Sequence, residues 1–125
     1  LGYTASGAFK QVRELEPHEV EEYISSTLKQ NGYRFALRIN GQSMENPTGR
    51  QHIPDGCIVV FNADRRTPDN GDLVLAKVAG ADEITFKKFV RDAGKVWLEP
   101  LNPRYPNITN EFRILATAEE MLQRL

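Results

Sequence analysis

The sequence predicts a mainly β domain of the α+β class, with one sizeable helix near its N-terminus. Apolar residues recur at helical spacing only between about Pro17 and Gln30. Beyond that point they alternate with polar residues or form short runs, and clusters of Gly, Pro, Asn and Asp separate those runs. The chain has 125 residues, which is enough for one compact domain with a single core.

The helix is predicted from Pro17 to Gln30. Proline is favoured in a first helical turn, and the glutamates that follow suit the positive end of the helix dipole. Asn31-Gly32 supplies a stop signal. The apolar stripe between these signals consists of Val20, Tyr23, Ile24 and Leu28. Residues 1–15 show no sustained period, so we expect an exposed arm ahead of the helix.

The pattern changes to that of strands after Gly32. Strands are predicted at Phe35 to Ile39, Cys57 to Phe61, Asp72 to Val78, Ile84 to Val90, Lys95 to Leu98 and Phe112 to Ala116. The turn residues Asp92-Ala93-Gly94 indicate a hairpin. A short terminal helix is predicted from Thr117 to Leu125, with Thr117 as its cap and Glu120 in the capping-box position.

Charge and composition exclude several classes of function. The chain has 16 basic and 17 acidic residues and a formal charge of -1, so it lacks the positive excess of a nucleic-acid surface. No apolar run approaches the roughly 20 residues of a membrane span, and the N-terminus does not resemble a signal peptide. We therefore expect a cytoplasmic protein with no membrane partner. Since the chain does not begin with Met, we also expect a fragment of something longer.

Cys57 is the single cysteine, which excludes an internal disulfide and fits a reducing compartment. A Cys57 nucleophile with His52 as its base is conceivable. Cys57 lies within an apolar run, however, and a buried thiol is usually an inert small apolar group. No Cys and His spacing indicates zinc, and no phosphate-binding glycine loop occurs. We expect neither a metal nor an organic cofactor.

Two segments contain residues that can act as a nucleophile and a base. Ser43 follows a predicted strand beside Gly41, where backbone N–H groups near Gln42, Ser43 and Met44 could receive an oxyanion. The alternative is a turn serine that hydrogen-bonds its own backbone.

The second segment contains Lys87 and Lys88 in an apolar strand. Burial favours the neutral amine, which can serve as a base to a serine. The alternative is a surface strand with two solvated lysines. Strand alternation alone would bury Lys88 with Phe86, and would place Lys87 on the face of Phe89.

Several linked motifs occur in one order: Gly-Gln-Ser-Met-x-x-Pro-Thr-Gly, Ile-Pro-Asp-Gly-Cys-Ile-Val-Val, Gly-Asp-Leu-Val-Leu-Ala-Lys, Thr-Phe-Lys-Lys-Phe-Val-Arg-Asp and Leu-Glu-Pro-Leu-Asn-Pro-Arg-Tyr-Pro. In order and spacing they resemble the C-terminal domain of lambda-type phage repressors, relatives of LexA and UmuD. The likeness runs from about Ser6 to Ala116. A set of linked motifs is far more specific than any one of them.

This resemblance implies a LexA-like peptidase and dimerisation domain of strongly twisted antiparallel strands over residues 16–125. It implies Ser43 as the nucleophile and Lys87, directly after Thr-Phe, as the base. The arm over residues 1–15 would carry the cleaved bond, Ser6-Gly7. The family usually has Ala or Cys before that glycine, so the Ser6 hydroxyl is a departure from the family pattern at the cleaved bond.

Three functions follow from the resemblance. The domain dimerises a prophage repressor that maintains lysogeny and cleaves itself when an activated RecA filament binds, as in the SOS response. Alternatively, cleavage is slow or lost, and a phage antirepressor relieves repression. The third function is that of a UmuD-like polymerase accessory. It fits less well, because the motif Leu-Glu-Pro-Leu-Asn-Pro-Arg-Tyr-Pro resembles a phage repressor. Operator DNA would be bound only through an upstream helix-turn-helix domain absent from this fragment. We expect at least a homodimer, with contacts at Trp97, Pro100, Leu101, Asn102 and Tyr105, unless Trp97 is merely core.

Overall fold

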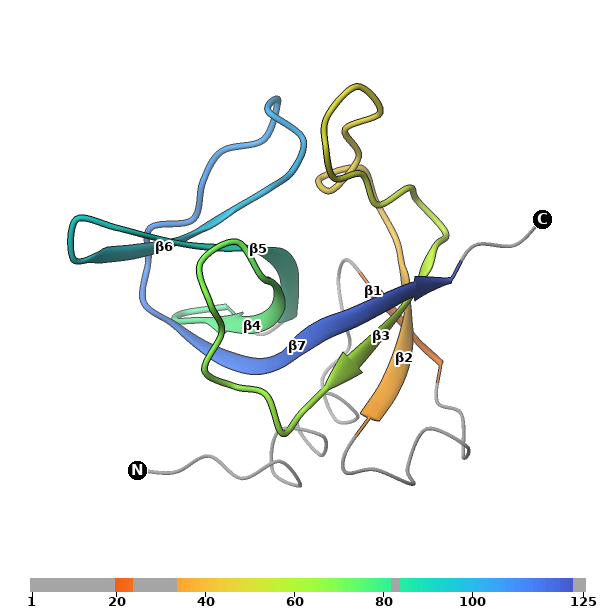
Figure 1. Cartoon of the computed structure of the whole chain (residues 1–125), viewed down its shortest axis with the longest axis horizontal. Coiled ribbons are helices and arrows are strands. Elements are labelled where there is room, and N and C mark those ends of the chain that lie inside the picture. The colour runs from red at the N-terminus through yellow and green to blue at the C-terminus, as the bar shows by residue number, and fades with distance from the viewer. Residues whose placement is uncertain (1–19, 24–33, 82–83, 123–125) are drawn as a thin grey trace.

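The computed structural model describes residues 20–23, 34–81 and 84–122, which form one antiparallel sheet of seven strands (Figure 1). The strands are β1 (Val20–Tyr23), β2 (Arg34–Ile39), β3 (Ile58–Asn62), β4 (Leu73–Val78), β5 (Ile84–Asp92), β6 (Lys95–Glu99) and β7 (Phe112–Leu122). Their order in the sheet is β1-β2-β3-β7-β4-β5-β6. The predicted mainly β fold is confirmed.

Strand β7 lies at the centre of the sheet, although it comes after the other described strands in the chain. It pairs with β3 on one side and with β4 on the other, and the register shifts once on each side. Such bulges bend a strand and increase its twist. In Figure 1, β7 (blue) curves between β2 and β3 on one side and β4 and β5 on the other.

The main core cluster gathers side chains from both halves of the sheet. Phe61 stacks with Phe35 at 5.8 Å between ring centroids and meets Phe86 edge-on at 5.2 Å. The loop between β2 and β3 adds Met44 and Ile53 to the same cluster. A second cluster contains Val74, Ala76, Phe89 and Leu98. The β5 strand therefore has packed side chains on both of its faces.

The helix predicted from Pro17 to Gln30 is wrong where the structure describes it, because Val20–Tyr23 is strand β1. This strand pairs with Ile39 to Ala36 of β2, whose other edge is taken by β3. The helical preference of four spaced apolar residues is weak. The backbone hydrogen bonds that the free edge of β2 offers stabilise the strand conformation more. The rest of that predicted helix and the arm lie outside the described residues.

The predicted terminal helix is also wrong, because β7 continues to Leu122. Its second half pairs with β3, with Glu120 opposite Val60. The Thr117 hydroxyl caps no helix and instead donates to the carbonyl of Arg65 at 2.6 Å. The capping-box pattern occurs in a strand here because pairing with β3 decides the backbone conformation.

The other predicted strands are confirmed with small shifts at their ends. The predicted hairpin joins β5 to β6 through Ala93 and Gly94, whose φ angles are 52° and 77°. Positive φ at both positions is typical of the tight turn whose twist matches that of the flanking strands.

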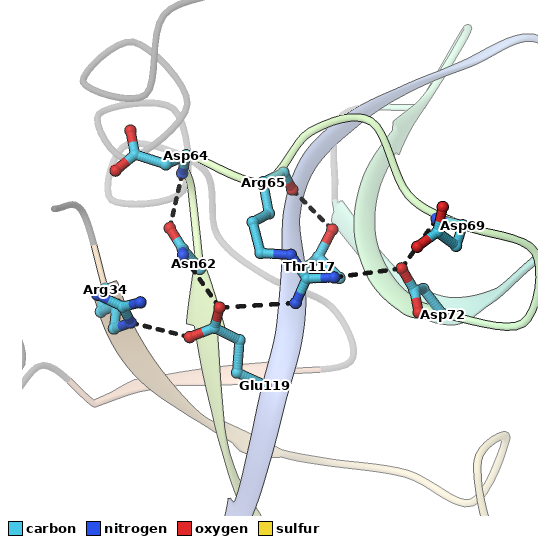
Figure 2. Close-up of polar contacts among 8 residues, drawn as sticks. All are labelled: Arg34, Asn62, Asp64, Arg65, Asp69, Asp72, Thr117 and Glu119. Carbon is cyan, nitrogen blue, oxygen red and sulfur yellow. Dashed lines mark hydrogen bonds and ion pairs between the residues drawn. The ribbon is translucent and has the colours of Figure 1, made fainter. Parts of the chain in front are cut away.

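A polar network fastens the connection between β3 and β4 to β7 (Figure 2). The register shift at Val60/Phe61 leaves Glu119 as the extra residue on β7. Its carboxylate accepts hydrogen bonds from Arg34 Nε at 2.8 Å and from Asn62 Nδ2 at 3.0 Å, and lies 3.6 Å from Arg65 Nη1. These contacts place three segments around one carboxylate.

Arg65 extends the same network toward β4. Its other nitrogen, Nη2, lies 3.5 Å from Asp72 Oδ2, which also accepts the backbone N–H of Asp69 at 2.9 Å (Figure 2). The network therefore links β2, β3 and β7 to Asp72, the residue that precedes β4.

Candidate active site

Ser43 lies in a turn directly after β2. The turn begins at Gly41, whose φ of 101° favours glycine and whose N–H donates to Asp55 Oδ1 at 2.9 Å. The next side chain after Ser43, that of Met44, is 1% exposed and packs in the main core. The Met44 carbonyl accepts the N–H of Ile53 at 2.9 Å. The turn is thus held on both sides of a half-buried serine.

Lys87 lies on β5 and is 4% exposed. Its amino group is 3.2 Å from Ser43 Oγ, 2.7 Å from Thr85 Oγ1 and 3.2 Å from the carbonyl oxygen of Phe86. All three are uncharged oxygens. The amino group is therefore within hydrogen-bond distance of the Ser43 hydroxyl while Thr85 and Phe86 hold it from within β5.

The two adjacent lysines have different surroundings. Lys88 is half-buried, and its amino group lies 4.0 Å from the carboxylate of Glu99. Strand alternation alone predicted that Lys88 would be the buried lysine, and this is wrong, because Lys87 is the more deeply buried of the two. The prediction fails for a physical reason: the face that carries Lys87 also carries Phe89 and packs in the second cluster, so apolar alternation cannot distinguish the two faces of β5.

A cavity of about 390 Å³ opens beside the two side chains. Volumes of this order are typical of ligand sites, which span about 300–1,000 Å³. It is lined by Ser43 and Lys87, by the turn residues 40–42, and by Tyr105, Pro106 and Ile108. Ile108 is fixed there because it exchanges two backbone hydrogen bonds with Leu98, at 2.8 and 3.0 Å. The Ser43 and Lys87 side chains therefore lie at the border of an open cavity.

The segment after β6 lies directly against the Ser43 turn. The backbone N–H of Asn102 donates to the Ser43 carbonyl at 3.0 Å, and its Nδ2 donates to the Gln42 carbonyl at 2.9 Å. The N–H of Leu101 lies 3.4 Å from the Met44 sulfur. Sequence analysis missed this contact, since the two segments are about 60 residues apart and only the fold joins them.

The structure places the residues expected at a dimer contact in unlike surroundings. Pro100 is buried, and Leu101 packs against the main core of its own chain. Trp97 is half-buried on β6, whereas Tyr105 is 41% exposed. Their contact with a second copy stays a prediction. Ser6 and Gly7, the expected cleavage bond, lie outside the described residues.

Cys57 and His52 are each engaged by other groups. The Cys57 thiol donates to the Leu122 carbonyl at 3.2 Å, and burial raises the pKa of this thiol above its ordinary value. His52 Nδ1 accepts the backbone N–H of Asn46 at 2.8 Å. A thiol less acidic than usual is a weak nucleophile, so these contacts do not favour a Cys57–His52 pair.

The described ranges contain no cluster of three His, Cys, Asp or Glu side chains that could hold a metal ion. Within the same ranges, no helix has the length and apolar character to cross a membrane.

Comparison with known proteins identifies the family to which this chain is similar. The sequence profile of the family described as Peptidase S24-like matches residues 2–118. The "HTH-type transcriptional regulator for conjugative element SXT" of Vibrio cholerae is 39% identical over 110 residues, covering 86% of this chain and 50% of the relative.

Two further relatives are repressors by name. "Repressor protein C2" of Salmonella phage P22 is 41% identical over 111 residues, again 86% of this chain and 50% of the relative. A "LexA repressor" of Mycolicibacterium smegmatis is 37% identical over 95 residues, covering 75% of this chain and 36% of the relative. The chain spans about half the length, or less, of these curated relatives.

Proposed function

Because this chain belongs to the Peptidase S24-like family, we propose that it is the self-association and self-cleavage domain of a transcriptional repressor of a prophage or similar mobile element. The single observation that carries the peptidase part is the 3.2 Å contact between Lys87 Nζ and Ser43 Oγ beside an open cavity. The names of the relatives support the repressor part. A helix-turn-helix domain upstream would bind the operator.

The proposed reaction begins with the neutral amine of Lys87, which removes the proton of Ser43 Oγ. The serine oxygen attacks the carbonyl carbon of Ser6, and backbone N–H groups of Ser43 and Met44 stabilise the oxyanion. As the intermediate collapses, the Ser6–Gly7 bond breaks and Lys87 gives its proton to the leaving amine of Gly7. A water molecule, deprotonated by Lys87, then hydrolyses the acyl-serine and restores Ser43.

The reaction is intramolecular, so it takes place once per chain. Its rate depends on how often the arm occupies the cavity and on the fraction of Lys87 that is neutral. Burial of the Lys87 side chain disfavours its charged form. In this proposal an activated RecA filament accelerates the step by favouring the docked arm. If the Ser6 hydroxyl prevents the arm from docking, a phage antirepressor relieves repression in place of the RecA filament. The polymerase accessory is disfavoured, because the relatives named above are regulators and repressors.

The test is to incubate the purified chain without added protease from neutral pH to about pH 10.4, the ordinary pKa of lysine. Intact mass spectrometry follows the appearance of a product that begins at Gly7. We expect cleavage to accelerate as pH rises, to stop in Ser43→Ala and in Lys87→Ala, and to persist in Lys88→Ala. Loss of cleavage in Lys88→Ala with retention in Lys87→Ala contradicts the assigned base.

Ser6→Ala separates the two routes of induction. If the wild-type chain stays intact at high pH while Ser6→Ala cleaves, the serine and lysine are competent and the arm is the obstacle. That outcome favours relief by an antirepressor. If neither chain cleaves at any pH, the peptidase part of the proposal is wrong.

We further propose that the domain forms a homodimer, since repressors bind paired half-sites related by two-fold symmetry. Two observations support a contact near Trp97 and Tyr105. β6 is a terminal strand of the described sheet, and Val96 next to Trp97 is 47% exposed. Sedimentation should detect a dimer well above micromolar concentration, and Val96→Asp should weaken it. A monomeric wild-type chain at those concentrations contradicts the proposal.

A further inference from the structure

Asn102 uses all of its polar groups within its own chain. Its N–H donates to the Ser43 carbonyl at 3.0 Å and its Nδ2 to the Gln42 carbonyl at 2.9 Å. Its Oδ1 accepts the N–H of Arg104 at 3.0 Å, and its carbonyl accepts the N–H of Tyr105 at 3.1 Å. The orientation of the side-chain amide is therefore fixed, with its donor directed at the turn that holds Ser43.

The two carbonyls that Asn102 binds belong to consecutive peptide groups. In a planar trans peptide the C=O and the N–H point in opposite directions. Because Asn102 binds the Gln42 carbonyl, it sets the direction of the Ser43 N–H in the same peptide group. Because it also binds the Ser43 carbonyl, it sets the direction of the Met44 N–H in the next one. Both N–H groups therefore point away from Asn102. They are the donors to which the proposed reaction assigns the oxyanion.

We propose that Asn102 is a positioning residue that orients the oxyanion donors of the Ser43 turn, an inference that rests on the proposed peptidase function. Without its side chain, the peptide between Gln42 and Ser43 loses the hydrogen bond from Asn102 Nδ2 and keeps the one from the N–H of Glu45, at 3.1 Å. That peptide can then rotate, which turns the Ser43 N–H away from the oxyanion and brings a carbonyl oxygen closer to it. A donor that points away from the oxyanion loses most of its ability to stabilise the transition state.

The test compares Asn102→Asp and Asn102→Ala with the wild-type chain. Aspartate keeps the volume and the acceptor for Arg104, but it cannot donate to Gln42. The matched controls are Asn107→Asp and Asn107→Ala, which make the same changes at an exposed position of the same loop. Two rates are measured across pH: self-cleavage, and labelling of Ser43 by a fluorophosphonate. The labelling reaction needs the oxyanion donors but does not need the arm.

Removing one oxyanion donor typically lowers a rate by about 10²–10³-fold, so misdirecting one should lower both rates by about 10–100-fold. In Asn102→Ala, which adds no charge, the pH at which each rate reaches half its maximum should not move, because the contact between Lys87 and Ser43 remains. The Asn107 variants should keep wild-type rates. All rates are measured below the unfolding transition of each variant, so that loss of fold does not contribute.

Wild-type rates in both Asn102 variants overturn the inference while leaving the proposed function intact. A shifted pH profile in Asn102→Ala, which adds no charge, also overturns it, because Asn102 would then act through Lys87. If the wild-type chain and the Asn107 variants neither cleave nor label, the proposed function fails and the inference fails with it.

Discussion

The hydroxyl of Thr85 lies 2.7 Å from the amino group of Lys87, two residues further along β5. Residues two apart share one face of a strand, and here both are buried, at 6% and 4% exposure. The Phe86 carbonyl oxygen lies 3.2 Å from the same amino group, and Ser43 Oγ lies 3.2 Å from it. Two of these three contacts come from β5 itself, so the strand that carries the base also helps to orient it.

Replacing Thr85 by valine should slow self-cleavage by about tenfold, because a neutral hydrogen bond of about 1–1.5 kcal/mol no longer holds the amine. Valine keeps the shape of the side chain, so the loss should appear in the rate and not in the fold. Thr85→Ser, which retains the hydroxyl, should cleave close to the wild-type rate. Equal rates for the valine and serine variants would show that the hydroxyl does not orient Lys87.

Lys87→Met should abolish cleavage and raise the free energy of unfolding by about 1 kcal/mol, because an apolar side chain of similar length replaces a buried amine. Urea denaturation measures the difference. Lys88→Met is the control: its side chain is 32% exposed, so its effect should stay within about 0.5 kcal/mol. A clear loss of stability in Lys87→Met would mean that the hydrogen bonds of the amine outweigh its burial.

Glu119 should make stability depend on pH in the acid range. Burial alone would raise the pKa of its carboxyl, but hydrogen bonds from Arg34 and Asn62 and the charges of Arg34 and Arg65 lower that pKa below its ordinary value of 4.5. A carboxyl with a lowered folded-state pKa contributes stability above its unfolded pKa and loses it as pH falls through the folded value.

The measurement is the free energy of unfolding of the wild type and of Glu119→Gln as pH falls. The glutamate side chain is 22% exposed, so we expect a difference of about 1 kcal/mol above the ordinary pKa. This difference should shrink below the ordinary pKa as the carboxylate is protonated. A difference that does not change with pH would place the stabilising interaction elsewhere than in the charge of Glu119.

Cys57 should react with thiol reagents only when the domain opens. Burial raises the pKa of this thiol, so little thiolate forms near neutral pH, and the core covers the sulfur. Labelling of the native protein should be at least about 100-fold slower than labelling in denaturant. Rapid labelling of the folded chain would contradict this, and would reopen the Cys57–His52 alternative.

Sequence patterns predicted the strands from β2 to β6 well, because each has an apolar run bounded by turn residues. They failed at β1 and at the end of β7, where pairing with another strand decides the conformation. No local pattern encodes that pairing. The same limit applies to the candidate site. The motifs singled out Ser43 and Lys87, but the contact of Asn102 with the serine turn depends on a loop about 60 residues away.

The central place of β7 has a consequence for how the domain is made. A ribosome releases β1 to β6 first, and until residues 112–122 emerge the facing edges of β3 and β4 have no strand between them. Open edges of this kind invite pairing with other chains. The sheet therefore closes late in synthesis and through contacts that are distant in sequence, which is a slow way to fold. Until then, the open edges of β3 and β4 are the sites at which the nascent domain is most exposed to aggregation.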